Sequence, residues 1–243
     1  NENHFLPRET ARVNLYIRGM KKMEKMKHRS LFYLMETPDN FNVDEKYPAI
    51  IFLHGAGSRG NDISVLEDNA YFKGSGRHGQ PFITFAPQCY ANTWFDIFEQ
   101  LGEFIEFCIS QPYVDRDRVY LIGASMGGYA VWQTAMTHPE WFAAAVPICG
   151  GGMYWNAERL KNIGVWAFHG EDDNDVLPRE SEIMVEKIKA CGGDARLTLL
   201  KKTGHDSWNA AYNSKEVFDW LLTCKRRIAP IGPDGYDNAE QFG

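Results

Sequence analysis

Short, continuously apolar segments alternate with amphipathic segments along most of this chain of 243 residues. Seven of the apolar segments have the length and content of buried strands: 31–35, 47–53, 82–86, 118–122, 142–148, 165–168 and 196–200. Four amphipathic segments have the apolar spacing of helices: 98–108, 128–138, 180–191 and 214–224. Strands that are apolar throughout and separated by helices are typical of a mostly parallel sheet covered on both faces. We therefore predict an α/β fold with a central sheet between two layers of helices.

Length and composition are those of a globular protein with one large domain. Apolar residues make up 44% of the chain and charged residues 24%, which excludes a disordered regulator, a collagen-like chain and a coiled coil. Residues 228–243 are rich in Gly, Pro, Asp and Asn and follow the last amphipathic segment. We therefore predict a single domain over residues 1–227 and a loose tail over residues 228–243.

Charge and hydropathy argue against nucleic-acid and membrane partners. The formal net charge is −6 at pH 7, whereas nucleic-acid binders present a basic stripe. The chain has no run of 18 apolar residues, the length that a membrane-spanning helix needs. The first residues lack an initiator Met and the apolar core of a secretion signal, and the five cysteines have no metal-ligand spacing. We expect a cytoplasmic protein, with secretion after removal of a signal as the alternative.

Residues Gly123-Ala124-Ser125-Met126-Gly127 match the pattern G-x-S-x-G between a predicted strand and a predicted helix. In a chain of this composition, chance gives about 0.07 such matches. The chain must reverse sharply here, and a side chain at either glycine would collide with a neighbouring strand or helix. An ordinary tight turn is the alternative. We predict that the turn exposes the Ser125 hydroxyl as a nucleophile.

A serine nucleophile needs a base, and three histidines follow Ser125 in the chain. His138 lies at a predicted helix end beside Pro139, which indicates a helix cap. His169 ends a buried strand, which indicates a packed histidine. His205 lies in a loop between the last predicted strand and the last predicted helix, where an imidazole can move protons. We therefore predict His205 as the base.

The base in turn needs a carboxylate to orient it, and several acidic residues follow the strand at 165–168. We predict Asp173 for this role, with Asp175 as the alternative, because the sequence does not fix the register of the turn. The order Ser, Asp, His along the chain is that of α/β-hydrolases.

Acyl transfer also requires donors for the developing oxyanion. We predict the backbone N–H of Met126 as one donor and that of Ala56 or Gly57 as the other. The loop at 55–60 also matches G-x-G-x-x-G, but no helix opens directly after it and no acidic residue ends the next strand. We therefore expect no nucleotide cofactor, and we predict no metal site.

Aromatic residues lie close in sequence to these motifs, and we predict that they line a flat cleft for an aryl acyl group or a sugar face. The predicted substrate-binding residues are Trp94, Tyr154, Trp155 and Trp208. Only about 15 residues separate the strands that end at 148 and begin at 165, which is too short for a large lid. We therefore expect a site that is open to water.

In these motifs the chain resembles the α/β-hydrolases of the esterase and "predicted peptidase" group, which also resembles feruloyl esterases and polyhydroxyalkanoate depolymerases. The resemblance runs from about residue 30 to residue 225. Five segments carry it: 54–60 (HGAGSRG), 86–88 (APQ), 123–127 (GASMG), 169–173 (HGEDD) and 204–208 (GHDSW).

The resemblance implies Ser125, Asp173 and His205 as a catalytic triad. Pro178 departs from the pattern, because similar sequences place this proline one residue earlier, and a shifted register would favour Asp175. We predict a serine carboxylesterase for small-molecule esters with short or aromatic (cinnamoyl or feruloyl) acyl groups, sugar-linked esters included. A serine peptidase and a non-catalytic ligand-binding protein on the same fold are the alternatives. The oligomeric state stays open.

Overall fold

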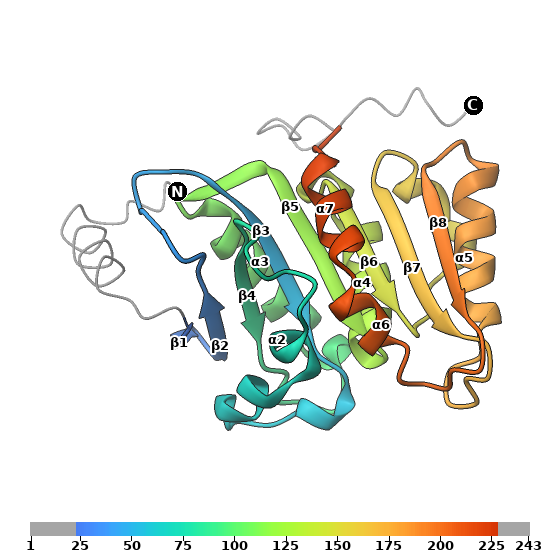
Figure 1. Ribbon diagram of the computed structural model, residues 1–243, viewed down its shortest axis with the longest axis horizontal. Coiled ribbons are helices and arrows are strands. Elements are labelled where there is room, and N and C mark those ends of the chain that lie inside the picture. The colour runs from blue at the N-terminus through green and yellow to red at the C-terminus, as the bar shows by residue number, and fades with distance from the viewer. Residues whose placement is uncertain (1–22, 228–243) are drawn as a thin grey trace.

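The computed structural model describes residues 23–227, and its eight strands form one sheet in the order β1-β2-β4-β3-β5-β6-β7-β8 (Figure 1). The strands are β1 (Met23–His28), β2 (Leu31–Glu36), β3 (Tyr47–Leu53), β4 (Ile83–Pro87), β5 (Val114–Ala124), β6 (Ala144–Ile148), β7 (Gly164–Gly170) and β8 (Ala195–Leu200). Strands β4, β3, β5, β6, β7 and β8 run parallel, and the hairpin of β1 and β2 adds two antiparallel strands at one edge. The predicted α/β fold is confirmed. The predicted tail at 228–243 lies outside the described residues.

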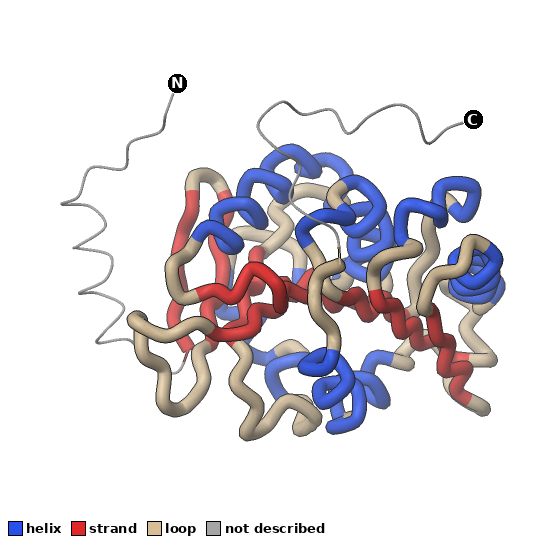
Figure 2. The backbone as a smooth tube through the Cα atoms, turned by 90° about the horizontal axis from the view of Figure 1, so that it is seen from above, coloured by secondary structure: helices blue, strands red, loops and turns tan. Residues whose placement is uncertain are grey.

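Helices cover both faces of the sheet, as Figure 2 shows. They are α2 (Ala70–Lys73), α3 (Phe98–Ser110), α4 (Met126–Thr137), α5 (Arg179–Ala190), α6 (Trp208–Asn213) and α7 (Lys215–Thr223). Because side chains alternate along a strand, neighbouring residues of β3 enter two different cores. Ile51 and Leu53 join the core beneath α3, α4 and α5, whereas Ile50 and Phe52 join the core beneath α2, α6 and α7. This two-sided burial explains why a central strand such as β3 is apolar throughout.

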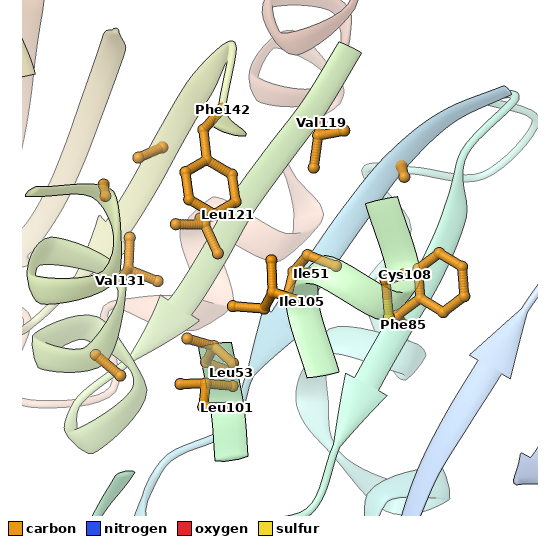
Figure 3. Close-up of a cluster of buried hydrophobic side chains, with 14 of the residues drawn as sticks. Ile51, Leu53, Phe85, Leu101, Ile105, Cys108, Val119, Leu121, Val131 and Phe142 are labelled. Atoms are coloured by element: carbon orange, nitrogen blue, oxygen red, sulfur yellow. The ribbon is translucent and has the colours of Figure 1, made fainter. Parts of the chain in front are cut away.

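The first of these cores is drawn in Figure 3. Leu101, Ile105 and Cys108 lie on one face of α3 and belong to the same buried cluster as Ile51 and Phe85 from the sheet. Burial of each large aliphatic or aromatic side chain contributes about 1.5–3 kcal/mol. The core therefore fixes the strands whose carboxyl ends carry the motifs.

Several elements differ from the sequence expectation: β5 begins at Val114 rather than at 118, and α2 and α6 were not predicted. Helix α4 begins at Met126, two residues before the predicted start at 128, since it opens directly from the serine turn. Strand β1 was not predicted, because the exposed side chains of Lys25 and Lys27 alternate with half-buried ones rather than forming an apolar run. Such a charged, half-exposed strand is typical of a sheet edge.

The segment between β6 and β7 holds one short 3-10 helix, Tyr154–Leu160, so no large cap interrupts the described fold at this place. Within residues 23–227, none of the helices combines the length and the apolar character that crossing a bilayer requires.

Candidate active site

Ser125 lies in the sharp turn between β5 and α4. Its backbone has φ 57° and ψ −120°, a conformation that is strained for a residue with a side chain. A Cβ atom at Gly123 would lie 2.5 Å from the carbonyl oxygen of Leu53, and one at Gly127 would overlap the same oxygen. Both glycines are therefore required for the turn to pack against β3, and the turn presents Ser125 at the carboxyl end of a central strand.

His205 contacts Ser125 and Asp173 through its two ring nitrogens. Its Nε2 lies 2.8 Å from Ser125 Oγ, and its Nδ1 lies 2.8 Å from Asp173 Oδ2. An ionised carboxylate only accepts hydrogen bonds, so Nδ1 carries the proton and Nε2 is free to accept the serine hydroxyl hydrogen. This is the tautomer that a general base for Ser125 needs.

The loop that carries His205 packs directly against the end of β7. A Cβ atom at Gly170 would overlap the carbonyl oxygens of Thr203 and Gly204, so only glycine allows this approach. The ring of Trp208 meets the His205 ring edge-on, with 5.5 Å between the centroids. The imidazole is thus held from the sheet side and from α6.

Asp173 is buried, with 2% of its surface exposed, whereas the alternative acid Asp175 is exposed. The backbone N–H groups of Asp175 and Val176 donate to Asp173 Oδ1 at 2.9 and 3.0 Å. Burial raises the pKa of the Asp173 carboxyl, but the hydrogen bonds from His205, Val176 and Asp175 outweigh it and hold the pKa below its usual value. Asp173 therefore remains a carboxylate at neutral pH and faces His205, while Asp175 contributes only its backbone.

The predicted oxyanion donors lie at two places beside Ser125. Met126 is the first residue of α4, where backbone N–H groups have no partner within the helix. Ala56 and Gly57 line the same pocket as Ser125. The segments that carry the predicted donors therefore both lie beside Ser125, as an oxyanion site requires.

His54 fixes the loop that carries Ala56 and Gly57, a role that the sequence analysis did not assign. Its Nδ1 lies 2.7 Å from the carbonyl oxygen of Gly55 and its Nε2 accepts from the backbone N–H of Cys89 at 2.9 Å. Burial lowers the pKa of His54 to about 4, so the ring is neutral. The only sequence signal for this role was the position of His54 directly after a buried strand.

A pocket of about 470 Å³ opens beside Ser125 and His205. Most of its wall is apolar and comes from Phe52, Ala70, Ala124, Trp208 and Tyr212. Ser58 and Asn69 add polar side chains, and Asn69 donates to the Ser58 hydroxyl oxygen at 3.2 Å.

The predicted aromatic residues occupy three different environments. Trp208 lines the pocket. The prediction for Trp94 is wrong, because its ring is fully buried in the core and its Nε1–H donates to the carbonyl oxygen of His54. Tyr154 and Trp155 are exposed on the segment that follows β6 and are not among the lining residues of this pocket.

The other two histidines after Ser125 have structural surroundings. The ring of His138 stacks on Trp141, with 3.7 Å between centroids, and His169 is fully buried. Within the described residues, the ligand atoms of Cys149, Asp173 and His205 lie within 4.8 Å of one another, so this group is the candidate set for a cation. Burial raises the pKa of the Cys149 thiol to about 12, so at neutral pH this side chain is not the thiolate that a metal ion needs. The other two side chains, Asp173 and His205, already bond each other.

Comparison with known proteins places this geometry in a family context. The sequence profile of the prolyl oligopeptidase family matches residues 69–161. Dipeptidyl-peptidase 5 of Porphyromonas gingivalis is 27% identical over 76% of this chain, which spans only 34% of that protein's length. The probable feruloyl esterase C of Aspergillus oryzae is 23% identical over 87% of this chain and 77% of its own length.

Among solved structures, a thermostable esterase matches with a TM-score of 0.75 and 32% sequence identity, over 84% of this chain and 63% of the esterase chain. Together with the parallel sheet and the G-x-S-x-G turn, this match shows the α/β-hydrolase fold and a similarity to the group of that superfamily that holds serine esterases and peptidases.

Proposed function

We propose that this chain is a serine carboxylesterase that hydrolyses esters of short or aromatic acyl groups, including sugar-linked ones. One observation carries the proposal. The hydrogen-bonded series Ser125–His205–Asp173 ends at a pocket whose wall is mainly apolar and receives no lid from the segment between β6 and β7. Such a pocket suits a compact apolar acyl group better than a long chain, which needs more cover from water.

The first half of the proposed reaction forms an acyl-enzyme. His205 Nε2 takes the hydroxyl proton as Ser125 Oγ attacks the ester carbonyl carbon, and Asp173 stabilises the imidazolium that results. The carbonyl oxygen becomes an oxyanion, which the backbone N–H groups of Met126 and of Ala56 or Gly57 receive. His205 then gives its proton to the leaving alcohol oxygen, and the acyl group stays on Ser125.

The second half releases the acid. His205 takes a proton from a water molecule, whose oxygen attacks the acyl carbon in place of the alcohol. The same donors hold the second oxyanion, and His205 returns the proton to Ser125 Oγ as the acid leaves. Each step moves one proton between neighbouring atoms, so the neutral His205 tautomer described above is the required starting state.

The acyl and alcohol groups of the substrate meet different surroundings in this proposal. The acyl group lies against Trp208 and the other apolar residues of the pocket. Tyr154 and Trp155, with 41% and 72% of their surfaces exposed, offer flat rings on the 3-10 helix after β6, at the same end of the sheet, where a sugar on the alcohol side can stack. The feruloyl esterase name of one relative supports an aromatic acyl group.

A panel of substrates tests the proposal: p-nitrophenyl acetate, methyl ferulate, a feruloylated sugar, an acetylated sugar and a peptide p-nitroanilide. We expect ester hydrolysis, with Ser125→Ala lowering kcat by about 10⁴-fold or more. Ester hydrolysis by purified Ser125→Ala at the wild-type rate would remove Ser125 from the mechanism.

A serine peptidase is the second candidate, because the prolyl oligopeptidase profile and the dipeptidyl-peptidase relative point to amide substrates. An ester and an amide with the same acyl group separate the two activities. We expect kcat/KM for the ester to exceed that for the amide by more than the ratio of their uncatalysed rates. If the ratio of kcat/KM for ester over amide were instead smaller than the ratio of the uncatalysed rates, the chain would be a peptidase.

A further inference from the structure

A second histidine approaches the carboxylate of Asp173. His169, the residue before the last one in β7, has Nε2 at 3.3 Å from Asp173 Oδ2. Its side chain is fully buried, and the mechanism proposed above assigns it no step. The question is therefore what this ring does beside the acid.

The contacts of His169 fix its orientation from both sides of the ring. Nε2 lies 2.8 Å from the carbonyl oxygen of Val176. A carbonyl oxygen only accepts, so Nε2 carries a proton and donates it. Nδ1 lies 2.8 Å from the hydroxyl oxygen of Ser181 on α5, and Ser181 in turn contacts the carbonyl oxygen of Gly150 at 3.0 Å. The ring thus connects β7, α5 and the segment after β6.

The contacts among His169, Val176 and Asp173 form a closed network. The backbone N–H of Val176 donates to Asp173 Oδ1 at 3.0 Å, the Val176 carbonyl accepts from His169, and the same His169 nitrogen faces Asp173 Oδ2. Asp172, Asn174 and Asp175 on either side of Asp173 are exposed. The turn therefore places one buried carboxylate in an otherwise solvent-facing loop, and His169 ties that turn to the rigid core.

We propose that His169 is a positioning residue for Asp173: its Nε2–H holds the turn at Val176 and keeps the carboxylate aligned with His205. The inference rests on the proposed function, since it assumes that Asp173 orients the base. A misplacement of about 1 Å in a catalytic group can lower the rate by about 100-fold. His169 is not a lining residue of the pocket, so its loss acts on kcat and leaves KM nearly unchanged.

Three variants test this role. His169→Phe removes both ring nitrogens but keeps an aromatic ring, and we expect kcat to fall roughly 10- to 100-fold with KM within about twofold of wild type. His169→Gln keeps an N–H that can reach the Val176 carbonyl, and we expect it to restore most of kcat. His138→Gln is the matched control, because His138 stacks on Trp141 at a helix end and takes no part in the site.

The alignment of Asp173 also has a spectroscopic readout that does not depend on turnover. The proton shared by His205 Nδ1 and Asp173 gives a far-downfield ¹H NMR signal when the bond is short and ordered. We expect His169→Phe to shift this signal upfield or broaden it, and His138→Gln to leave it in place. If His169→Phe does not fold, Ser181→Ala frees the other side of the ring and is expected to change the same signal.

Wild-type kcat and an unchanged downfield signal in folded His169→Phe would overturn the proposal. So would equal losses in His169→Phe and His169→Gln, because packing alone would then explain the effect. Failure of the proposed function has a different signature: Ser125→Ala would retain ester hydrolysis, whereas the His205 signal would still report whether His169 holds Asp173.

Discussion

His205 Nε2 lies 2.8 Å from Ser125 Oγ, although 80 positions separate the two residues in the chain. The approach depends on two close packings: the serine turn against β3, and the His205 loop against the end of β7. Both occur at the carboxyl ends of parallel strands, where α/β sheets place their ligands. The two side chains that we propose as nucleophile and base are therefore aligned before a substrate arrives.

The identity of the acid is tested by two neighbouring carboxylates. We expect Asp173→Asn to lower kcat by about 10⁴-fold, because the amide favours the wrong His205 tautomer. Asp175→Asn should change kcat by less than about threefold, because the exposed side chain of Asp175 is not part of the hydrogen-bonded series and only its backbone N–H bonds Asp173. Steady-state kinetics on methyl ferulate decide the matter, and a larger loss in Asp175→Asn would assign the acid to Asp175.

The acyl pocket is tested through Trp208. Trp208→Ala removes an aromatic side chain from the pocket wall. We expect KM for methyl ferulate to rise about two- to tenfold, because the aromatic acyl group loses this contact, while KM for p-nitrophenyl acetate changes little. Trp155→Ala should leave methyl ferulate hydrolysis unchanged and weaken only the feruloylated sugar. Equal effects of both variants on both ferulate esters would contradict the separation of acyl and alcohol surroundings.

The neutral, buried His54 predicts a specific acid sensitivity of folding. Burial holds its pKa at about 4 in the native state, below the usual histidine value of about 6.5, so between these values the unfolded chain binds the extra proton. The contribution of His54 is fully present above pH 6.5 and is lost as the pH falls towards 4, by about 3 kcal/mol in total.

Urea unfolding at pH 7.5, 5.5 and 4.5 measures this loss. Wild type and His138→Gln should lose stability in parallel, whereas His54→Gln should show a shallower loss over the same interval. Identical slopes for His54→Gln and wild type would show that the native state protonates His54 as readily as the unfolded chain does, which contradicts the lowered pKa.

The serine turn makes a prediction about stability rather than rate. Gly127→Ala places a methyl group on the Leu53 carbonyl oxygen, and we expect the free energy of unfolding to fall by about 2–4 kcal/mol. Gly102→Ala in α3 is the matched control, because apart from the neighbouring backbone of the helix itself no atom lies within 4 Å of the added methyl group. In a helix interior that change should raise stability by about 0.5–1 kcal/mol. If Gly127→Ala left the free energy of unfolding unchanged, β3 would have to move away from the turn.

Strand predictions succeeded where burial on both faces makes the sequence apolar throughout, as in 47–53 and 165–168. Strand β1 was missed because an edge strand carries charged residues and lacks that signal. The prediction that Trp94 lines the cleft was wrong, because it relied only on closeness to a motif in the sequence. A tryptophan near a motif can equally well lie in the core and bond the loop from there, as Trp94 does through His54.

The nucleophile, base and acid were predicted from chemistry and chain order, and the structure brings Ser125, His205 and Asp173 together; their catalytic roles remain a prediction. The residues that fix the loops behind them were not predicted. His54 accepts from the backbone N–H of Cys89, 35 positions along the chain, and His169 contacts the backbone carbonyl of Val176 across the turn. A single sequence contains no pattern for such contacts.

The glycine at position 170 has a consequence for redesign. Since no side chain fits between β7 and the His205 loop, that side of the site cannot be reshaped by substitution without moving the imidazole. Ser58, Asn69 and Ala70, on the connection after β3, line the pocket without being placed in the proton path. New acyl preferences can therefore be engineered from that connection while the machinery for bond cleavage is left untouched.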